Sequence, residues 1–473
     1  MIIGRNNEIQ RLKDAYNSEY SEFVAVTGRR RVGKTFLIRE TFNYKFTFQH
    51  SGLANQKTRM QLREFKKSLE DAGLKKCRIP VDWFDAFALL ETLISRSKQK
   101  KKIIFIDELP WMDAPKSNFV SALEHFWNAF ASARKDILLI ICGSATSWII
   151  NKIYKNHGGL HNRVTYRINL QPFSLYECEL YSDKNNLAMS RTEILQCYMV
   201  LGGVPYYWSK LQKSKTFSQN IDNLFFNENG ELCNEFNDMY MSLFKNPLPY
   251  LTIIEALATK KVGMTREELT SKSNIPTNGT LTKILEDLQA CGFIKKYNFW
   301  GLKDNKAVFQ LIDNFTLFYY RFIRNNAAGD ENFWTNSDGK PIRYVWEGLA
   351  FERVCFLHTR QIKAALGISG ITANIVSWYA KDDEVLGDGT QIDMLIDRTD
   401  NAVNICEIKF YNSEFIINKQ YEMNLRNKVA RFKLETETKK SVRLVLITVH
   451  GLKRNIYSDF IQNTLTLNEL FKE

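Results

Sequence analysis

A glycine-rich segment near the start of the chain constrains the fold more than any other feature. Residues 28–35 read Gly-Arg-Arg-Arg-Val-Gly-Lys-Thr, and they stand between the apolar stretch Phe23–Val26 and an amphipathic stretch that begins at Phe36. This is the GxxxxGK[ST] pattern in the strand–loop–helix context that it requires. The glycines let backbone N–H groups face a phosphate, and the first turn of the helix adds positive potential there. The segment therefore predicts a phosphate-binding loop in an α/β domain.

The side chains of this loop have distinct expected tasks. Lys34 would reach the terminal phosphates of ATP and assist their transfer, and Thr35 would ligate Mg²⁺. ATP and Mg²⁺ are therefore the expected cofactors. The residues expected to bind the nucleotide along the loop and the first helical turn are Gly28, Arg29, Arg30, Arg31, Val32, Gly33, Lys34, Thr35 and Phe36.

Two further apolar stretches end in polar residues that suit the same chemistry. The stretch Lys102–Asp107 is expected to be a buried strand; Asp107 at its end would hold Mg²⁺, and the next residue, Glu108, would polarise the attacking water. The stretch Ile137–Gly143 is followed by Ser144, a candidate sensor of the terminal phosphate, although Ser144 could equally be a helix N-cap and nothing more. Fully buried strands of this kind are typical of a parallel sheet with helices on both faces.

Length and composition narrow the class of protein. With 473 residues, the chain exceeds what one hydrophobic core usually holds, so about three domains are expected. A hydrophobic fraction of 44%, no signal sequence and no apolar run near the roughly 20 residues that cross a bilayer predict a folded, cytoplasmic protein without a membrane segment. The eight cysteines are scattered, so neither disulfides nor a zinc site is expected. A net charge of +13 favours contact with a polyanion such as nucleic acid.

Changes in residue pattern divide the chain into three expected domains. Residues 1–215 would form the phosphate-binding α/β domain with its lid, residues 216–325 a small helical module, and residues 340–473 a second α/β domain. The module shows short helices followed by a basic, aromatic hairpin at Lys295–Gln310, which is the order of elements in a winged helix.

If the middle module binds DNA, its third helix, Asn278–Cys291, would enter the major groove and its hairpin would meet phosphates. This helix is not notably basic, so docking of a protein partner stays an alternative. The candidate DNA contacts are Thr277, Asn278, Thr280, Thr282 and Lys283 on the helix, and Lys295, Lys296, Lys303 and Lys306 on the hairpin.

The C-terminal domain carries a compact group of charged residues on two expected strands around the turn 398–401. Asp393 lies on the first strand, and Glu407 and Lys409 lie on the second. Residues two apart on a strand share a face, so Glu407 and Lys409 are expected to project together toward Asp393. Two carboxylates beside a lysine suit Mg²⁺ and the activation of water against a phosphodiester. An ordinary salt-bridged hairpin is the alternative.

The N-terminal motifs together resemble the archaeal-type P-loop ATPase family, which is on the AAA+/STAND side of the P-loop ATPases and similar to origin-recognition ATPases. The motifs that carry this resemblance are Ile3-Gly4-Arg5-Asn6-Asn7-Glu8, the loop 28–35, IIFIDE at 103–108, CGSATS at 142–147 and Gly202-Gly203-Val204-Pro205.

The resemblance implies further nucleotide contacts. Gly4 and Arg5, with Glu8, would open the lid that covers adenine, and the turn 202–205 would lie in the helical lid near the nucleotide. That turn could also be simply a helix cap. Arg163 takes the family's position for an arginine finger, where members often have Gly-Arg and this chain has Asn-Arg. Arg167 is its rival, and a solvated arginine is the alternative for both.

The C-terminal charged group resembles the site of the PD-(D/E)XK nuclease superfamily, as the C-terminal domains of long archaeal-type ATPases do. This resemblance implies a restriction-endonuclease-like α/β domain in which Asp393 and Glu407 are metal ligands, Lys409 assists the nucleophile or the leaving charge, and Glu352 is a helix-borne acid. The residue at position 391 is Gln391, where an acidic residue would be common.

The leading hypothesis is an ATPase that couples nucleotide state to DNA binding and to Mg-dependent DNA cleavage by its C-terminal domain. A second hypothesis is a STAND-type regulatory switch, which binds protein partners and cleaves nothing. A third is a remodelling ATPase that assembles as a homo-oligomeric ring and supplies its arginine finger in trans.

Overall fold

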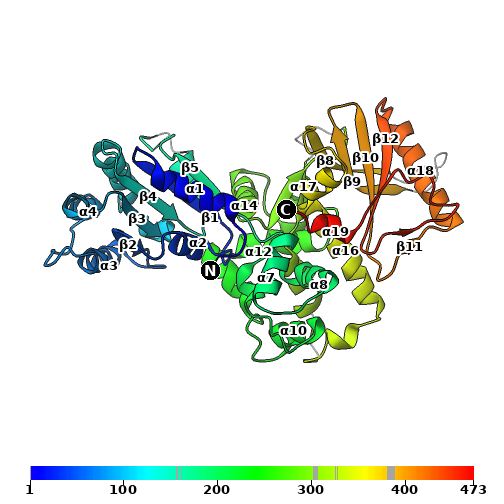
Figure 1. The fold of residues 1–473 in the computed structure, drawn as a ribbon, viewed down its shortest axis with the longest axis horizontal. Coiled ribbons are helices and arrows are strands. Elements are labelled where there is room, and N and C mark those ends of the chain that lie inside the picture. Colours follow the sequence, from blue (N-terminus) through cyan, green and yellow to red (C-terminus); the bar gives the residue numbers. More distant parts are fainter. Residues whose placement is uncertain are drawn as a thin grey trace. The chain divides into compact units, whose positions relative to one another are not determined.

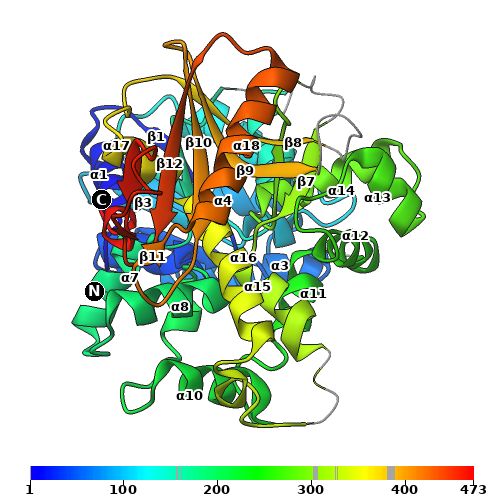
Figure 2. The same ribbon diagram turned by 90° about the vertical axis from the view of Figure 1, so that its right-hand side faces the viewer.

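The computed structural model of the protein describes residues 2–155, 158–160, 162–244, 246–301, 307–324, 326, 329–380 and 389–473. Two of the candidate phosphate contacts, Lys303 and Lys306, lie outside these ranges. The chain forms two units, Met1–Pro172 and Phe173–Glu473 (Figures 1 and 2). None of the helices in the described ranges combines the length and the apolarity needed to span a bilayer.

The first unit is built on a parallel sheet with the strand order β2-β3-β4-β1-β5 (Figure 1). Every residue of β1, β3 and β4 is buried, which confirms the prediction of buried strands. The strands are β1 Glu22–Gly28, β2 Phe48–Ser51, β3 Lys102–Asp107, β4 Ile137–Cys142 and β5 Tyr166–Leu170. The helices are α1 Asn6–Asn17, α2 Lys34–Thr41, α3 Thr58–Asp71, α4 Trp83–Arg96, α5 Phe119–His125 and α6 Thr146–Ile149.

Two hydrophobic clusters cover the two faces of this sheet. Phe23 and Ala25 of β1 belong to the cluster that includes α3, α4 and α5, whereas Val24 and Val26 belong to the cluster that includes α1 and α2. Successive residues of a strand point to opposite faces, so helices lie on both sides of β1. This is the three-layer arrangement that the apolar runs predict.

The second unit begins with helices and a short hairpin. Its helices up to residue 318 are α7 Leu175–Lys184, α8 Arg191–Leu201, α9 Pro205–Trp208, α10 Phe217–Ile221, α11 Glu235–Leu243, α12 Leu248–Ala258, α13 Arg266–Ser273, α14 Gly279–Ala290 and α15 Asn314–Phe318. The hairpin pairs β6 Ile294–Tyr297 with β7 Val308–Leu311 in antiparallel fashion, and Met264 adds a bridge to Phe309. Thr265 caps α13 in a capping box with Glu268, as its sequence predicts.

The sequence places a domain boundary at residue 215, whereas the two units divide at Pro172/Phe173. Residues 173–215 stay with the second unit because polar contacts tie them to it. The Tyr207 hydroxyl donates to Glu235 Oε1 at 2.8 Å, and the Tyr198 carbonyl accepts from Asn314 Nδ2 at 2.9 Å. The boundary at residue 215 is predicted from a change in local sequence pattern, and such a change does not reveal contacts between residues far apart in the chain.

The C-terminal part of this unit contains a mixed sheet with the order β14-β12-β10-β9-β8. Strand β9 is antiparallel to β8 and β10, and β12 is parallel to β10 and β14. Helix α18 lies along one face of this sheet (Figure 2), where Leu425 and Phe432 pack with Leu395 and Ile405. The elements are α16 Pro341–Leu357, α17 Thr359–Ala365, β8 Ala373–Ala380, β9 Thr390–Arg398, β10 Ala402–Lys409, β11 Phe415–Ile416, α18 Lys419–Thr436, β12 Ser441–Thr448, β13 Leu452–Lys453, β14 Asn463–Leu465 and α19 Leu467–Leu470.

The β6–β7 hairpin docks on this sheet. The Trp300 N–H donates to the Ser377 carbonyl of β8 at 2.9 Å. The Trp300 ring lies 5.2 Å from Phe432 of α18, and Phe299 lies 5.0 Å from Tyr379 of β8. The middle module and the C-terminal domain that the sequence separates are therefore in direct contact inside the second unit.

A buried histidine joins α16 to α7 and makes this junction sensitive to pH. His358 accepts the Leu175 N–H at 3.0 Å through Nε2, and Nδ1 lies 2.8 Å from the Val354 carbonyl. Burial lowers the pKa of His358 from 6.5 to about 4, against the opposing effect of its hydrogen bond to Val354. Between these pH values the unfolded chain binds more protons than the folded one, so stability is lost as the pH falls.

We expect this loss to reach about 2 kcal/mol at pH 5 relative to pH 7.5. Amide hydrogen exchange, corrected for its intrinsic pH dependence, would accelerate at residues 173–201 and 341–365. The variant His358→Gln keeps a donor and an acceptor but does not titrate, so its protection would be nearly independent of pH. Equal pH dependence in both proteins would exclude His358 as the origin.

Candidate functional site

The phosphate loop joins β1 to α2 in a conformation that depends on its glycines. A Cβ at Gly28 would collide with the Leu170 carbonyl oxygen, and Gly33, the N-cap of α2, has a φ of 90°. Arg31 is also left-handed, with a φ of 69°. The side chain of Lys34 is buried, and its ammonium donates to the carbonyls of Gly28 at 2.9 Å and Arg29 at 3.0 Å. The ammonium therefore lies across the loop that is expected to hold the phosphates.

Asp107, the last residue of β3, connects this strand to the phosphate loop. The Thr35 hydroxyl donates to Asp107 Oδ2 at 2.8 Å, although 72 residues separate the two. The Glu108 N–H donates to Oδ1 at 2.9 Å, and the Asp107 side chain is 6% exposed. A hydroxyl and a carboxylate oxygen at this separation are hard donors of the kind that Mg²⁺ prefers, so these residues fit the ion.

Glu108 follows β3 with a left-handed backbone, φ 48°, and it is held by Ser144. The Ser144 hydroxyl lies 3.0 Å from both Glu108 carboxylate oxygens, and the Ser144 N–H donates to Oε2 at 3.4 Å. The N-cap of α6 is Ala145, so Ser144 does not act as a cap there. The two residues thus lie together at the ends of β3 and β4, which is where a water-polarising acid and a phosphate sensor are expected.

Two contacts of this site were not assigned from the sequence. The Cys142 thiol donates to Asp107 Oδ1 at 2.6 Å, and burial, together with Asp107, raises the pKa of this thiol well above its usual value. The buried Thr146 hydroxyl lies 3.3 Å from the Gly28 N–H and 3.4 Å from its carbonyl. The CGSATS segment contains both residues, but only the pairing of β4 with β1 and β3 brings them to the loop.

The remaining nucleotide candidates have separate positions. Gly4 and Arg5 precede α1 with φ values of 60° and 64°, and Arg5 is buried and caps that helix through its carbonyl. Arg163 is exposed and donates to the Gly159 carbonyl at 3.4 Å. The guanidinium of Arg167 lies 4.6 Å from the centre of the Tyr154 ring.

The turn 202–205 has the geometry of a helix cap. Gly202 ends α8 with a φ of 60°, and Pro205 opens α9. A Cβ at Gly203 would collide with the Phe173 carbonyl, so close packing requires glycine there. The turn belongs to the second unit.

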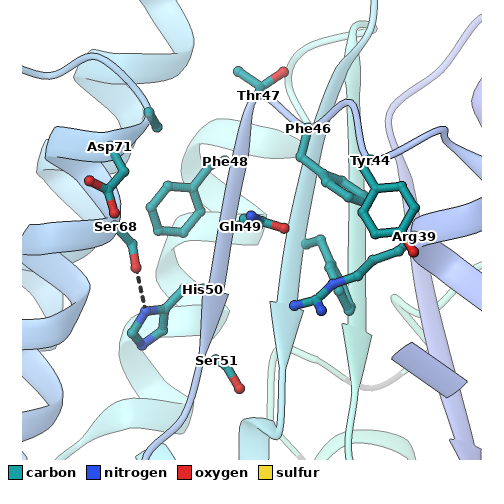
Figure 3. A pocket seen from close by; sticks show the side chains of 12 residues that line it. Arg39, Tyr44, Phe46, Thr47, Phe48, Gln49, His50, Ser51, Ser68 and Asp71 are labelled. Atoms are coloured by element: carbon teal, nitrogen blue, oxygen red, sulfur yellow. Dashed lines mark hydrogen bonds between the residues drawn. The ribbon is translucent and has the colours of Figure 1, made fainter. Parts of the chain in front are cut away.

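A separate pocket of about 290 Å³ lies beside the edge strand β2 (Figure 3). Its lining comes from α2, β2, β3, the end of α3 with Ala72, and the segment between α2 and β2, and the loop 28–35 is not part of it. His50 Nδ1 lies 2.9 Å from the Ser68 hydroxyl at this wall, and burial lowers the pKa of His50 to about 4. His50 is therefore a neutral wall residue at physiological pH.

In the C-terminal domain, Glu407 and Lys409 lie together, as alternation along β10 predicts. Lys409 Nζ is 3.2 Å from Glu407 Oε1, the Tyr421 hydroxyl donates to the same oxygen at 2.6 Å, and Lys428 Nζ is 2.8 Å from Oε2. Burial alone would raise the pKa of Glu407, but the two lysines and Tyr421 lower it to about 2. Glu407 is thus a fixed carboxylate beneath α18.

Asp393 has different partners. Gln391 Nε2 donates to Asp393 Oδ1 at 2.6 Å, and Lys261 of the middle module lies 3.5 Å from the same oxygen. Lys261 Nζ also lies 2.8 Å from Glu352 Oε2 on α16. The structure therefore brings Glu352 and Asp393 together around Lys261, and Gln391 takes part through its amide.

The expectation that Glu407 and Lys409 point toward Asp393 is not what the structure shows among its described residues. The β8–β9 register slips between Val376 and Trp378, and Ile392 and Leu395, three residues apart, lie in one hydrophobic cluster with α18. The alternation of side chains between the two faces of β9 is therefore broken at Asp393. The Asp393 side chain lies beside Glu352 and Lys261, and not beside Glu407 and Lys409. Within the described ranges, no three His, Cys, Asp or Glu side chains gather as a metal site.

Comparison with known proteins assigns the N-terminal region. Residues 2–211 match the model of a family described as an ATPase domain predominantly from Archaea, so this region carries an archaeal-type ATPase domain. The uncharacterized protein MJECL04 of Methanocaldococcus jannaschii is 24% identical over 390 residues, which are 81% of this chain and 83% of that protein. That match extends well beyond the ATPase domain.

Solved structures similar to this chain include the Walker-type ATPase PABY2304 of Pyrococcus abyssi, with a TM-score of 0.47 and 16% identity over 68% of this chain and 96% of that chain. Another is the ORC2 protein of Aeropyrum pernix in ADPNP–ADP complexes, with a TM-score of 0.38 and 12% identity over 67% of this chain and 92% of that chain.

Proposed function

We propose that this protein is a Mg-dependent ATPase whose nucleotide state controls a DNA-binding and DNA-cleaving C-terminal half. The observation that carries the ATPase part is the 2.8 Å hydrogen bond between Thr35 of the phosphate loop and Asp107 at the end of β3. It joins two motifs that are far apart in the sequence at one point, where a magnesium ion and the terminal phosphates would meet.

Each residue of this site has a task that follows from its chemistry. Lys34 would exchange its carbonyl partners for phosphate oxygens, which carry more negative charge. Thr35 and Asp107 would hold Mg²⁺, which neutralises charge on the phosphates when it is bound. Glu108 would accept a hydrogen bond from the attacking water and so polarise it. The Ser144 hydroxyl would keep the Glu108 carboxylate in place.

The DNA-binding part is supported by the order of elements in the middle module. Three helices, α12, α13 and α14, are followed by the β6–β7 hairpin, which is the order of a winged helix. Thr280 and Lys283 are exposed on α14, whereas Thr282 accepts a hydrogen bond from Arg266. The helix is thus the available DNA contact of this module, because the residues just after β6 dock on β8.

The cleavage part is supported by the C-terminal topology. Apart from the short elements α17 and β11, a helix, three antiparallel strands, a second helix and a parallel strand follow one another from α16 to β12. The charged residues lie at the adjoining ends of β9 and β10. This order of elements is that of the restriction-endonuclease-like fold that the ExK motif implies. Its candidate residues are Asp393 and Glu407, which would hold a divalent metal ion, together with Lys409 and with Glu352 on α16.

Magnesium-dependent cleavage of plasmid and linear DNA, with and without ATP, tests the proposal. We expect Lys409→Ala to reduce cleavage about a hundredfold and to leave ATP hydrolysis unchanged, because it removes a cation next to the reacting phosphate. The exposed Lys439 offers a matched control, and Lys439→Ala should cleave normally.

A regulatory switch that binds protein partners is the second candidate. It is favoured by the ion pairs of Glu407, which resemble those of an ordinary structural cluster. Absence of cleavage under every nucleotide state, together with slow turnover and tight retention of ADP, would put this candidate first.

A further inference from the structure

One lysine of the middle module is inserted among the acidic residues of the C-terminal domain. Lys261 lies in the connection between α12 and α13, 91 residues before Glu352. Its ammonium is 3.0 Å from Oε1 and 2.8 Å from Oε2 of Glu352, and 3.5 Å from Oδ1 of Asp393. A single cation therefore bridges the helix-borne acid and the strand-borne acid.

The backbone around Lys261 is fixed to the β6–β7 hairpin. Gln310 Nε2 donates to the Lys261 carbonyl at 2.8 Å, and the Tyr297 hydroxyl donates to the Val262 carbonyl. The same hairpin leads into Trp300, which bonds to β8. Movement of the hairpin away from the sheet would thus withdraw Lys261 from the acids.

The charges around this position favour an occupying cation. Glu352 and Asp393 repel each other: burial and the Asp393 charge raise the pKa of Glu352, and Lys261 counteracts this. Burial lowers the pKa of Lys261, but the two carboxylates outweigh it and raise the pKa overall. The buried Arg353 contributes a second positive charge nearby while its Nε donates to the Leu311 carbonyl at 3.2 Å.

We propose that Lys261 is an inhibitory plug: its ammonium pairs with the Asp393 and Glu352 carboxylates, which a divalent cation at this acidic site would need, and the docked hairpin holds it there. The inference rests on the proposed cleavage function, since it describes how the same site is kept inactive. The ammonium would repel a divalent cation at these oxygens, because like charges a few ångströms apart interact strongly. Magnesium would bind only after the middle module releases the lysine.

The surroundings allow this exchange. The Lys261 side chain is 35% exposed, and Asp393 is 30% exposed, so the ammonium can pass into water without crossing a hydrophobic core. The neighbouring Lys260 pairs with Glu268 inside its own module, so it provides a comparison in which only the target of the lysine differs.

The first test is Mn²⁺ binding to the full-length protein without nucleotide, measured by electron paramagnetic resonance. We expect Lys261→Met to bind Mn²⁺ at least about tenfold more tightly than the natural chain at one site, because a competing cation is gone. Lys260→Met and Lys261→Arg should match the natural chain, and Lys261→Met combined with Asp393→Asn should lose the gain. Circular dichroism would verify that each variant is folded.

Equal Mn²⁺ affinity in Lys261→Met and in the natural chain would overturn the plug, whatever the cleavage result. DNA cleavage by the same variants separates this failure from failure of the proposed function. Tighter Mn²⁺ binding with about tenfold faster cleavage supports both. Tighter binding without any cleavage supports the plug and rejects the nuclease, whereas equal cleavage and equal affinity in both proteins reject the plug and keep the nuclease.

Discussion

Replacing Lys34 by alanine is expected to reduce ATP hydrolysis by at least about a thousandfold, because the lysine supplies the positive charge at the terminal phosphates. In the present structure the Lys34 residue is 6% exposed, and its ammonium donates to the carbonyls of Gly28 and Arg29 in its own loop. Its removal should therefore leave the sheet intact. Steady-state phosphate release measures the loss, and circular dichroism with a thermal melt verifies the fold.

The exposed Lys45, which follows the same helix, offers a control for the loss of one positive charge. Lys45→Ala should hydrolyse ATP at the normal rate. Normal turnover by a folded Lys34→Ala protein would contradict the assignment of the whole site, because Lys34 is the lysine of the loop 28–35 that would neutralise the terminal phosphates.

Replacing Glu108 by glutamine should slow hydrolysis about a hundredfold to ten-thousandfold, the usual contribution of a positioned general base, while ATP still binds. The amide keeps the shape of the side chain and a partner for the Ser144 hydroxyl, so the loop and Asp107 should stay in place. Single-turnover hydrolysis gives the rate of the chemical step, and binding of a fluorescent ATP analogue gives the affinity.

Ser144→Ala should have a smaller effect, because it releases the Glu108 carboxylate without removing it. Glu64→Gln on α3 is a control for the change of an acid to an amide elsewhere in the same unit. If Glu108→Gln hydrolysed bound ATP as fast as the natural chain, the water would have to be polarised by another group. Loss of ATP binding in this variant would instead indicate a structural role for Glu108.

Much of the ATPase site follows from local sequence because short segments determine it. The apolar run before Gly28 forms β1, since both of its faces are covered. The contact between Thr35 and Asp107 follows from two motifs, the phosphate loop that contains Thr35 and the acidic end of the strand that contains Asp107. The bonds of Cys142 and Thr146 to this site do not follow in the same way. They depend on which strands become neighbours, and the sequence contains no local signal for that order.

The C-terminal site shows a second limit. Alternation along β10 predicts the pairing of Glu407 with Lys409, since both belong to one regular strand. Alternation fails at Asp393 because the pairing of β8 with β9 shifts by one residue nearby. The order of residues 389–397 does not predict this shift. The position of Lys261 depends on the packing of one module on another, which no periodicity describes.

The docking of Trp300 on β8 also reduces the part of the C-terminal sheet edge that is open to pairing with another chain. Strand β8 is the last strand of its sheet, and an uncovered last strand offers unpaired N–H and C=O groups to any other chain. The bond from the Trp300 N–H to Ser377 and the ring contact of Phe299 with Tyr379 occupy part of that edge. The hairpin thus covers part of an edge that another chain could otherwise join, and a fragment that began after the hairpin would expose it.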